Sequence, residues 1–178
     1  MKYLTPIFSV LIFVSLALLP MTTSAETQNY RLGAGDTIVI KVYGEEALTL
    51  ETQITNSGTI NYPFLGSLKL IGLSIKEVEQ IVYNGLKGDY FVEPNVFVGM
   101  VEYRPFYIHG EVKKPGGYPY QPGMTVNQAV ALAGGLTERA SEDKIAISRE
   151  GSKVESERGT INSAIQAGDT ITIEQRFF

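Results

Sequence analysis

The sequence predicts an α+β fold of two small domains, each a mixed β-sheet with one main amphipathic helix. Short runs that alternate apolar and polar residues recur along the chain, which is typical of half-buried strands. Two other segments open with a serine or threonine cap and continue with apolar residues at helical spacing. Arg104 and Pro105 interrupt a strand pattern midway between these helices. We therefore expect one domain over residues 26–103 and a second over 104–178.

The composition indicates a folded protein and excludes several chemistries. Of 178 residues, 44% are hydrophobic, and the net charge is only -4. The chain has no Cys and one His, so disulfides, thiolate metal sites, iron–sulfur clusters, thiol nucleophiles and multi-histidine metal sites are not expected. With 15 Lys and Arg against 19 Asp and Glu, it lacks the basic footprint that nucleic acid requires. We expect no metal, no cofactor and no nucleic-acid partner.

Residues 1–25 are typical of an export signal. Lys2 supplies the positive start, Ile7 to Leu19 is largely apolar, and small residues precede a cleavage point after Ala25. A membrane span is the competing interpretation, but the apolar run is shorter than the roughly 20 residues that a span needs, and Pro20 follows it. The sequence predicts a cleaved signal peptide and a periplasmic or secreted mature chain. That chain has neither a Cys for an acyl anchor nor a later membrane-spanning stretch, so partners would have to hold it at a membrane.

The first half predicts three strands and a helix. Thr37 to Tyr43 alternates as a strand, the run Asn56-Ser57-Gly58 indicates a hairpin tip, and Leu68 to Ile71 forms a second short strand. Asn95 to Tyr103 resumes strand-like alternation. Between these last two strands, Ser74 and Glu77 have capping-box spacing, and Gly88 supplies a stop. The residues expected on the buried face of this helix are Ile75, Val78, Ile81, Val82 and Leu86.

The second half repeats this plan. Phe106 to Val112 predicts a strand, and the Pro-Gly-Gly sequence within residues 113–117 predicts a tight turn. Thr125 and Gln128 repeat the capping spacing ahead of a helix, which the paired glycines Gly134 and Gly135 end. Lys144 to Arg149 and Thr170 to Glu174 are expected to close the sheet. Each half is large enough for one modest core.

A five-residue sequence occurs once in each half. Ala34-Gly-Asp-Thr-Ile38 recurs as Ala167-Gly-Asp-Thr-Ile171, each time ahead of an alternating strand. We interpret both copies as one turn-into-strand device, in which Asp accepts amide hydrogen bonds and Gly allows the bend. Two copies are too few to predict a solenoid.

Candidate catalytic sites are weak. The Gly-rich run at Leu32 lacks the third Gly of a dinucleotide fingerprint and precedes a strand instead of a helix. His109 has no serine-elbow motif to serve, so a structural or surface role is favoured. Glu111 could belong to a glycosidase pair, but no residue pattern selects its partner and no Trp offers a sugar platform.

Tyrosines gather near the expected join between the halves. They are Tyr103, Tyr107, Tyr118 and Tyr120. Tyrosine can bury its ring and keep its hydroxyl wet, so the cluster suits a protein interface or a polar lumen. Ordinary strand tyrosines are the alternative interpretation.

In order, these motifs resemble the polysaccharide export proteins of the Wza-like outer-membrane family. The first half is similar to the polysaccharide export domain, and the second half to the soluble-ligand-binding β-grasp (SLBB) domain. The resemblance covers residues 30–173 and rests on an ordered series of turn residues, which we expect to be mainly structural: Gly35, Asp36, Gly58, Pro63, Gly66, Gly72, Pro94, Gly110, Pro115, Gly116, Gly134, Gly135, Gly168 and Asp169.

The resemblance implies a non-enzymatic function. It implies a ring of subunits that forms a periplasmic conduit for capsular polysaccharide or exopolysaccharide and docks on an inner-membrane copolymerase. Longer family members carry an acylated Cys and a C-terminal membrane-crossing helix, which this sequence lacks. We therefore expect a short form that lies in the periplasm and is associated with the outer membrane through its partners. It would hand polymer to a separate outer-membrane β-barrel, and Phe177 and Phe178 are the candidate docking residues. A periplasmic glycan-binding or sensory module and a periplasmic hydrolase are the alternatives.

Overall fold

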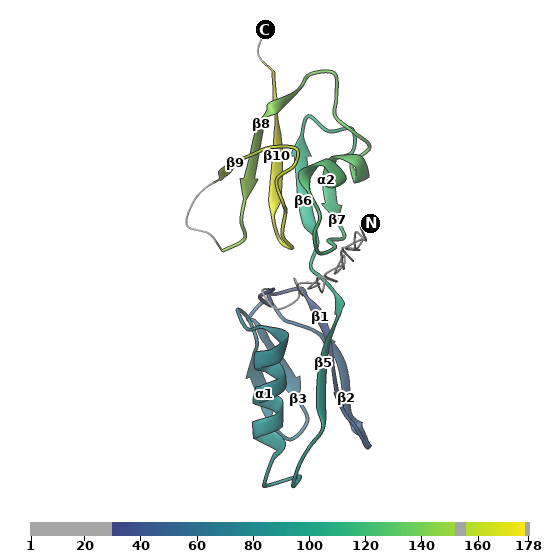
Figure 1. The fold of residues 1–178 in the computed structure, drawn as a ribbon, viewed down its shortest axis with the longest axis vertical. Helices are drawn as coiled ribbons and strands as arrows, with labels where there is room; N and C mark the ends of the chain where they lie inside the picture. Colours follow the sequence, from purple (N-terminus) through teal and green to yellow (C-terminus); the bar gives the residue numbers. More distant parts are fainter. Residues whose placement is uncertain (1–29, 152–155, 177–178) are drawn as a thin grey trace, which may run out of the picture.

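The computed structural model describes residues 30–151 and 156–176, so the predicted signal peptide and the candidate docking residues Phe177 and Phe178 lie outside the described residues. It is an α+β fold, as predicted, with two lobes joined end to end (Figure 1). One lobe comprises β1 to β5 with α1, the other comprises β6 to β10 with α2, and the chain passes between them at residues 103–105. The elements are β1 Thr37–Val42, β2 Glu45–Gln53, β3 Thr59–Tyr62, β4 Gly66–Lys69, α1 Ile75–Leu86, β5 Val96–Glu102, β6 Phe106–Gly110, β7 Gly116–Tyr118, α2 Val126–Leu132, β8 Ala140–Ser148, β9 Glu157–Gly159 and β10 Thr170–Gln175.

Each lobe has its own hydrophobic core. In the first lobe an antiparallel sheet of order β2-β1-β5 packs with α1 and the β3-β4 hairpin around Ile38, Ile40 and Leu86. In the second lobe the sheet order is β7-β6-β10-β8-β9, and α2 packs its Val126 and Ala129 against that sheet. The β6-β10 pair is parallel and the other pairs are antiparallel, so the second sheet is mixed.

The helix α1 follows its capping signal closely. The Ser74 hydroxyl accepts a hydrogen bond from the Glu77 amide at 3.3 Å, and the Glu77 carboxylate accepts one from the Ser74 amide at 2.6 Å. Gly88, with φ of 94°, follows the helix as predicted. The expected buried face is wrong at Ile81, which is 38% exposed. Val78, Val82 and Leu86 form the buried face of the helix, and Ile81 lies at the side of that face.

Two strand predictions in the first lobe are corrected. The turn at residues 56–58 exists, but it joins β2 to β3, which belong to different sheets, so it is no hairpin tip. The strand β2 was not expected, because only Leu48 in its first half is buried and the pattern of that half is polar. The strand β4 ends at Lys69, two residues before Ile71, because the Leu70 and Ile71 amides instead donate to the Gly58 carbonyl.

The second lobe follows its predicted plan, with β6 shorter and β8 and β10 longer than predicted. Strand β6 ends at Gly110 and not at Val112, since Gly110 has a φ of 88° that turns the chain out of the sheet. The Gln128 side chain accepts a hydrogen bond from the Thr125 amide at 2.9 Å, as the capping spacing predicts. The three-residue strands β7 and β9 were not expected, because each is too short to show alternation, and β7 begins inside the predicted turn at residues 113–117.

Gly110 provides a test of this packing. A Cβ at this position would overlap the backbone carbonyl oxygen of Ile173 on the neighbouring strand β10. Gly110→Ala should lower the free energy of unfolding by about 3 kcal/mol or more, because the steric overlap adds to the roughly 1–2 kcal/mol cost of a left-handed conformation. Urea denaturation followed by circular dichroism measures the change.

Gly116→Ala, in the same sheet, is the matched control, because a Cβ there has no neighbour within 4 Å. Its free energy of unfolding should stay within about 0.5 kcal/mol of the wild-type value or rise. Equal losses in the two variants would contradict the packing described here.

Candidate functional site

A buried carboxylate lies where the two lobes meet. Asp36 is fully buried immediately before β1, and Gly35, with φ of 93°, makes the bend that turns its side chain inward. The carboxylate accepts hydrogen bonds from the Gly33 amide at 2.8 Å, the Tyr30 hydroxyl at 2.8 Å and the Arg104 amide at 2.8 Å. The Arg104 guanidinium adds an ion pair at 2.9 Å. Every oxygen of this buried group is therefore paired, which makes its burial tolerable.

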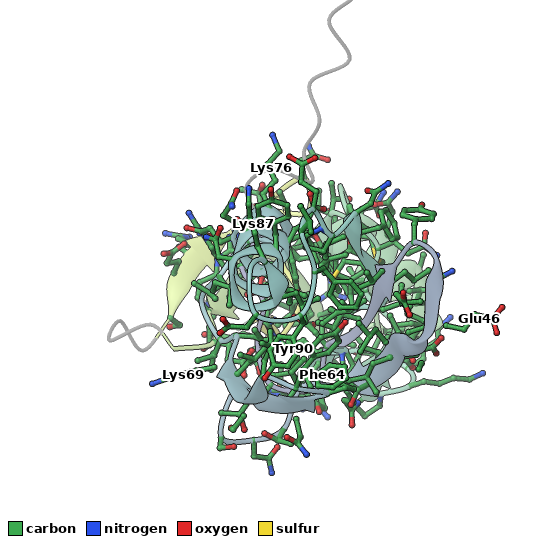
Figure 2. All side chains as sticks on the ribbon, turned by 90° about the horizontal axis from the view of Figure 1, so that it is seen from below. Glu46, Phe64, Lys69, Lys76, Lys87 and Tyr90 are labelled. Atoms are coloured by element: carbon green, nitrogen blue, oxygen red, sulfur yellow. The ribbon has the colours of Figure 1, made fainter. Side chains whose placement is uncertain are left out.

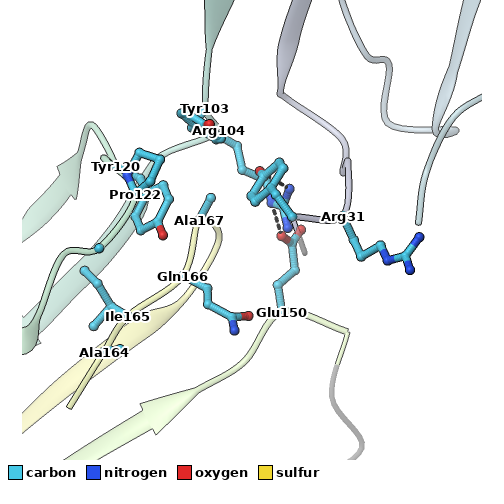
Figure 3. Close-up of a pocket in the computed structure, with 12 residues that line it drawn as sticks. Arg31, Tyr103, Arg104, Tyr120, Pro122, Glu150, Ala164, Ile165, Gln166 and Ala167 are labelled. Carbon is cyan, nitrogen blue, oxygen red and sulfur yellow. Dashed lines mark hydrogen bonds and ion pairs between the residues drawn. The ribbon is translucent and has the colours of Figure 1, made fainter. Parts of the chain in front are cut away.

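Arg104 connects the lobes. Its Nη1 donates to the Asp36 carboxylate at 2.9 Å and to the Tyr30 hydroxyl at 2.8 Å, both in the first lobe. Its Nε donates to Glu150 of the second lobe at 2.6 Å (Figure 3). The Arg104 side chain is only 15% exposed. Gly168 gives room for this arrangement, because a Cβ there would overlap the Glu150 carboxylate. One arginine thus joins carboxylates from both lobes.

The second lobe repeats the buried carboxylate. Asp169 is 1% exposed, accepts a hydrogen bond from the Gln166 amide at 2.7 Å and forms an ion pair with Arg149. In each copy the Asp amide also donates to the carbonyl three residues earlier, at 3.3 Å for Asp36 and 3.2 Å for Asp169. Burial raises the pKa of Asp169, while the Gln166 amide and Arg149 act in the opposite direction. The repeated sequence therefore forms one turn-into-strand device twice, each with its own arginine.

Three tyrosines cross the junction beside Arg104. The rings of Tyr30 and Tyr103 meet edge to face at 4.9 Å, and those of Tyr103 and Tyr120 at 5.6 Å. Burial, reinforced by the hydrogen bond to Asp36, raises the pKa of the Tyr30 hydroxyl well above its ordinary value. Tyr30 is thus a neutral donor. Edge-to-face pairs of this kind add about 0.5–1.5 kcal/mol each beyond the area that they bury.

The predicted tyrosine cluster is only partly correct. Tyr103 and Tyr120 come together at the junction, whereas Tyr118 stacks on Phe106 at 6.0 Å and Tyr107 is half exposed. Tyr30 was missed as a member, because it lies far from the others in the sequence. Its position six residues before the buried Asp36 could have indicated it.

A pocket of about 440 Å³ opens between the lobes at this point (Figure 3). It presents tyrosine ring faces beside a guanidinium, a carboxylate and an amide, so it could hold a polar ligand such as a sugar. The groups that line it include Tyr30, Tyr103, Arg104, Tyr120, Glu150 and Gln166. The charged groups of this set are already engaged in ion pairs with one another or with Asp36.

The two candidate catalytic residues lie elsewhere. His109 is exposed, with its Nε2 3.1 Å from the Thr172 hydroxyl. The Glu111 carboxylate accepts a hydrogen bond from Thr137 and lies 3.9 Å from the Arg139 guanidinium. Neither lines the junction pocket. Within residues 30–151 and 156–176, no group of three or more His, Asp or Glu side chains could hold a metal ion.

The motif residues are spread over both lobes. Only the two repeated Gly-Asp pairs, Gly35-Asp36 and Gly168-Asp169, reach the junction. The remaining glycines with positive φ occupy turns or element ends: Gly58, Gly66, Gly72, Gly110, Gly134 and Gly135. Pro63, Pro94 and Pro115 lie outside the helices and strands, and Gly116 begins β7. That these residues serve mainly structure stays a prediction.

Neither α1 nor α2 could cross a lipid bilayer, and no other helix of the described part of the chain is long and apolar enough to do so.

Comparisons with known proteins divide the chain in a similar place. A family model described as polysaccharide biosynthesis/export protein matches residues 24–101, and a model of the SLBB domain matches residues 105–157.

Several curated proteins match part of this chain over part of their own length. The exopolysaccharide production protein ExoF of Rhizobium meliloti (strain 1021) is 34% identical over 63% of this chain and 30% of its own length. The EPS I polysaccharide export outer membrane protein EpsA of Ralstonia nicotianae (strain ATCC BAA-1114 / GMI1000) is 26% identical over 85% of this chain and 49% of its own. The polysialic acid transport protein KpsD of Escherichia coli is 28% identical over 72% of this chain and 23% of its own length. The chain therefore spans between about a quarter and a half of these relatives.

Two arginine–carboxylate pairs test the importance of the junction. Arg104→Met should lower the free energy of unfolding by about 3–5 kcal/mol, because it leaves the buried Asp36 carboxylate without a cation. Arg31→Met is the matched control. Its partner Glu77 and Arg31 itself are 50% and 59% exposed, so the loss should be much smaller than that for Arg104→Met.

Urea denaturation of both variants measures the difference. Adding Asp36→Asn to Arg104→Met should recover part of the loss, because it removes the unpaired charge. Similar losses for Arg104→Met and Arg31→Met would contradict the assignment of the junction as a buried, energetically important ion pair.

Proposed function

Because the chain belongs to the polysaccharide export family and combines the export domain with an SLBB domain, we propose that it is a periplasmic component of a capsular or exopolysaccharide export machine. In this proposal its copies assemble into a ring that conducts polymer towards an outer-membrane pore. The two consecutive family matches, together with relatives named for polysaccharide production, export and transport, are the observation that carries the proposal.

The chemistry of the described residues supports a conduit over an enzyme. The charged groups at the junction stabilise the fold through ion pairs with one another, and Glu111 is engaged by Thr137 and Arg139. A conduit needs to bind its polymer weakly, because a tight site would stop transit. A chain without Trp and with a net charge of -4 suits weak and transient contact with sugars.

The proposed partners follow from this role. They are the polysaccharide itself, an inner-membrane polysaccharide copolymerase, further copies of this chain and a separate outer-membrane β-barrel. The proposed location is the periplasm, in association with the outer membrane through those partners. Docking through Phe177 and Phe178 is part of the proposal, although both lie outside the described residues.

A glycan-binding or sensory module is the second candidate. The junction pocket favours it, since tyrosine faces beside Glu150 and Gln166 could hold a saccharide. Such a module would bind its glycan with saturable affinity and would act as a monomer. A conduit differs on both counts, so the two functions can be separated by experiment.

Deletion of the gene tests the proposed function. If the chain is part of the conduit, extracellular polysaccharide should fall to background while cell-associated polymer or its precursor persists, and the wild-type gene should restore export. The measurement is the amount of polymer inside and outside the cells.

Complementation with Glu111→Gln separates the conduit from a hydrolase. A conduit should regain full export with this variant, because the Glu111 carboxylate contacts Thr137 and Arg139 and takes no part in chemistry on the polymer in this proposal.

The deletion strain also separates the alternatives. Unchanged export in this strain would contradict the proposed function. Polymer that the deletion strain still exports, but with an altered chain length, would indicate a hydrolase. Intact export with altered expression of export genes would indicate a sensor.

A further inference from the structure

The sheet of the first lobe has two open edges. Its order is β2-β1-β5, so β5 and β2 each pair with β1 on one side and with no strand on the other within the described part of the chain. The Leu48 carbonyl of β2 accepts a hydrogen bond from the Tyr62 hydroxyl at 2.9 Å. Within residues 30–151 and 156–176, no other strand pairs with the outward backbone groups of β2 and β5, so an added strand could pair there.

The β5 edge borders an apolar groove. The groove has a volume of about 620 Å³ and lies between β5 and the start of α1. Its lining includes Ile75, Phe97, Val98 and Met100, and its one charged lining residue is Lys76. An added strand could pair with β5 and place alternate side chains in this groove, which is the arrangement of strand addition.

The first five residues of β5 lack the usual protection of an edge strand. Soluble proteins usually guard such an edge with lysine, proline or a very short strand, yet β5 has seven residues, VFVGMVE, with neither lysine nor proline. Phe97 and Val101 are 42% and 48% exposed on its outer face, and the Phe97 ring lies over Gly99. Glu102 and a register shift against β1 lie at the end of the strand, so the apolar edge over residues 96–100 is the part expected to have a partner strand.

The β2 edge complements it in charge. Strand β2 carries three exposed carboxylates, Glu45, Glu46 and Glu51, and has no Lys or Arg among its nine residues. Seen from below, Glu46 extends away from one side of the first lobe (Figure 2). A strand with this charge suits a groove whose charged residue is Lys76.

The two edges also match in direction and facing. Both β2 and β5 run antiparallel to β1, so they are parallel to each other. Val39 pairs with Glu51 on one side and with Gly99 on the other, which places Glu51, Val39 and Gly99 in one row across the sheet. Thr49 and Val101 are exposed like Glu51, and each lies where the register with β1 shifts.

We propose that the β5 edge of one copy pairs in parallel with the β2 edge of the next copy, so that the first-lobe sheets continue from subunit to subunit. This contact joins two different surfaces, and such head-to-tail contacts form a ring when the rotation closes. The inference rests on the proposed ring and assigns its interface. Each copy uses both edges, so no strand edge of this sheet stays open in a closed ring.

Two exposed valines test the interface. Val101→Lys introduces a charge on the β5 edge and should leave the variant folded but monomeric, because Val101 contributes little to the core. Val92→Lys is the matched control, since Val92 is 89% exposed in the loop between α1 and β5 and should leave assembly unchanged. Native mass spectrometry or multi-angle light scattering gives the mass of each, and thermal unfolding confirms that each is folded.

Cross-linking in the periplasm supplies a second measurement, in which the cell's own partners are present. The chain contains no Cys, so an engineered pair reports only on its own two positions. Val101→Cys combined with Thr49→Cys, or with Glu51→Cys to allow for register, should give a disulfide-linked ladder of dimers, trimers and larger species. Val101→Cys with Lys69→Cys should give no ladder. Lys69 and the β2 residue Glu46 extend from opposite sides of the first lobe, so Lys69 lies away from the β2 edge (Figure 2).

The outcomes separate the interface from the ring. The edge assignment would be overturned if both the wild-type protein and Val101→Lys assemble and the Cys pairs do not cross-link. That result would leave the proposed function intact. Val101→Cys alone giving only dimers would overturn the edge assignment in favour of a twofold β5-to-β5 contact. Wild-type protein that is monomeric both at high concentration and in cells would contradict the ring itself.

Discussion

The ion pair between Asp36 and Arg104 is the constraint on which the arrangement of the two lobes depends. A fully buried carboxylate needs a cation and hydrogen-bond donors, and the chain supplies them from Gly33, Tyr30 and Arg104. Because Arg104 also binds Glu150, the requirement of one buried charge determines where the second lobe sits. The tyrosine rings then pack around a position that the charges have already defined.

The same feature gives the charged groups of the junction a structural role. Its carboxylates and guanidinium are paired with one another, so they contribute to stability. A subunit whose lobes hold one relative orientation is well suited to repeat around an axis, since closure of a ring tolerates little variation in subunit shape. Function would then reside in the surfaces between copies more than in one cavity.

The sequence predicted those features that depend on local signals. The capping residues Ser74 and Thr125 located both helices, and the alternation of β1 located its buried face. The strand β2 was missed because its partner lies across a turn and half of its pattern is polar. The junction was predicted only as a tyrosine cluster, because the meeting of Asp36, Arg104 and Glu150 depends on pairing between residues far apart in the chain, which no local pattern encodes.

The distance between the lobes, measured by pulsed electron spin resonance, tests the account most directly. Spin labels on Lys69→Cys in the first lobe and Glu142→Cys in the second would be the only labelled sites in a chain without native Cys. If the Asp36–Arg104 pair sets the orientation, the distance distribution should be narrow in the otherwise wild-type protein and clearly broader when Arg104→Met is added. Distributions of equal width with and without Arg104 would contradict the account.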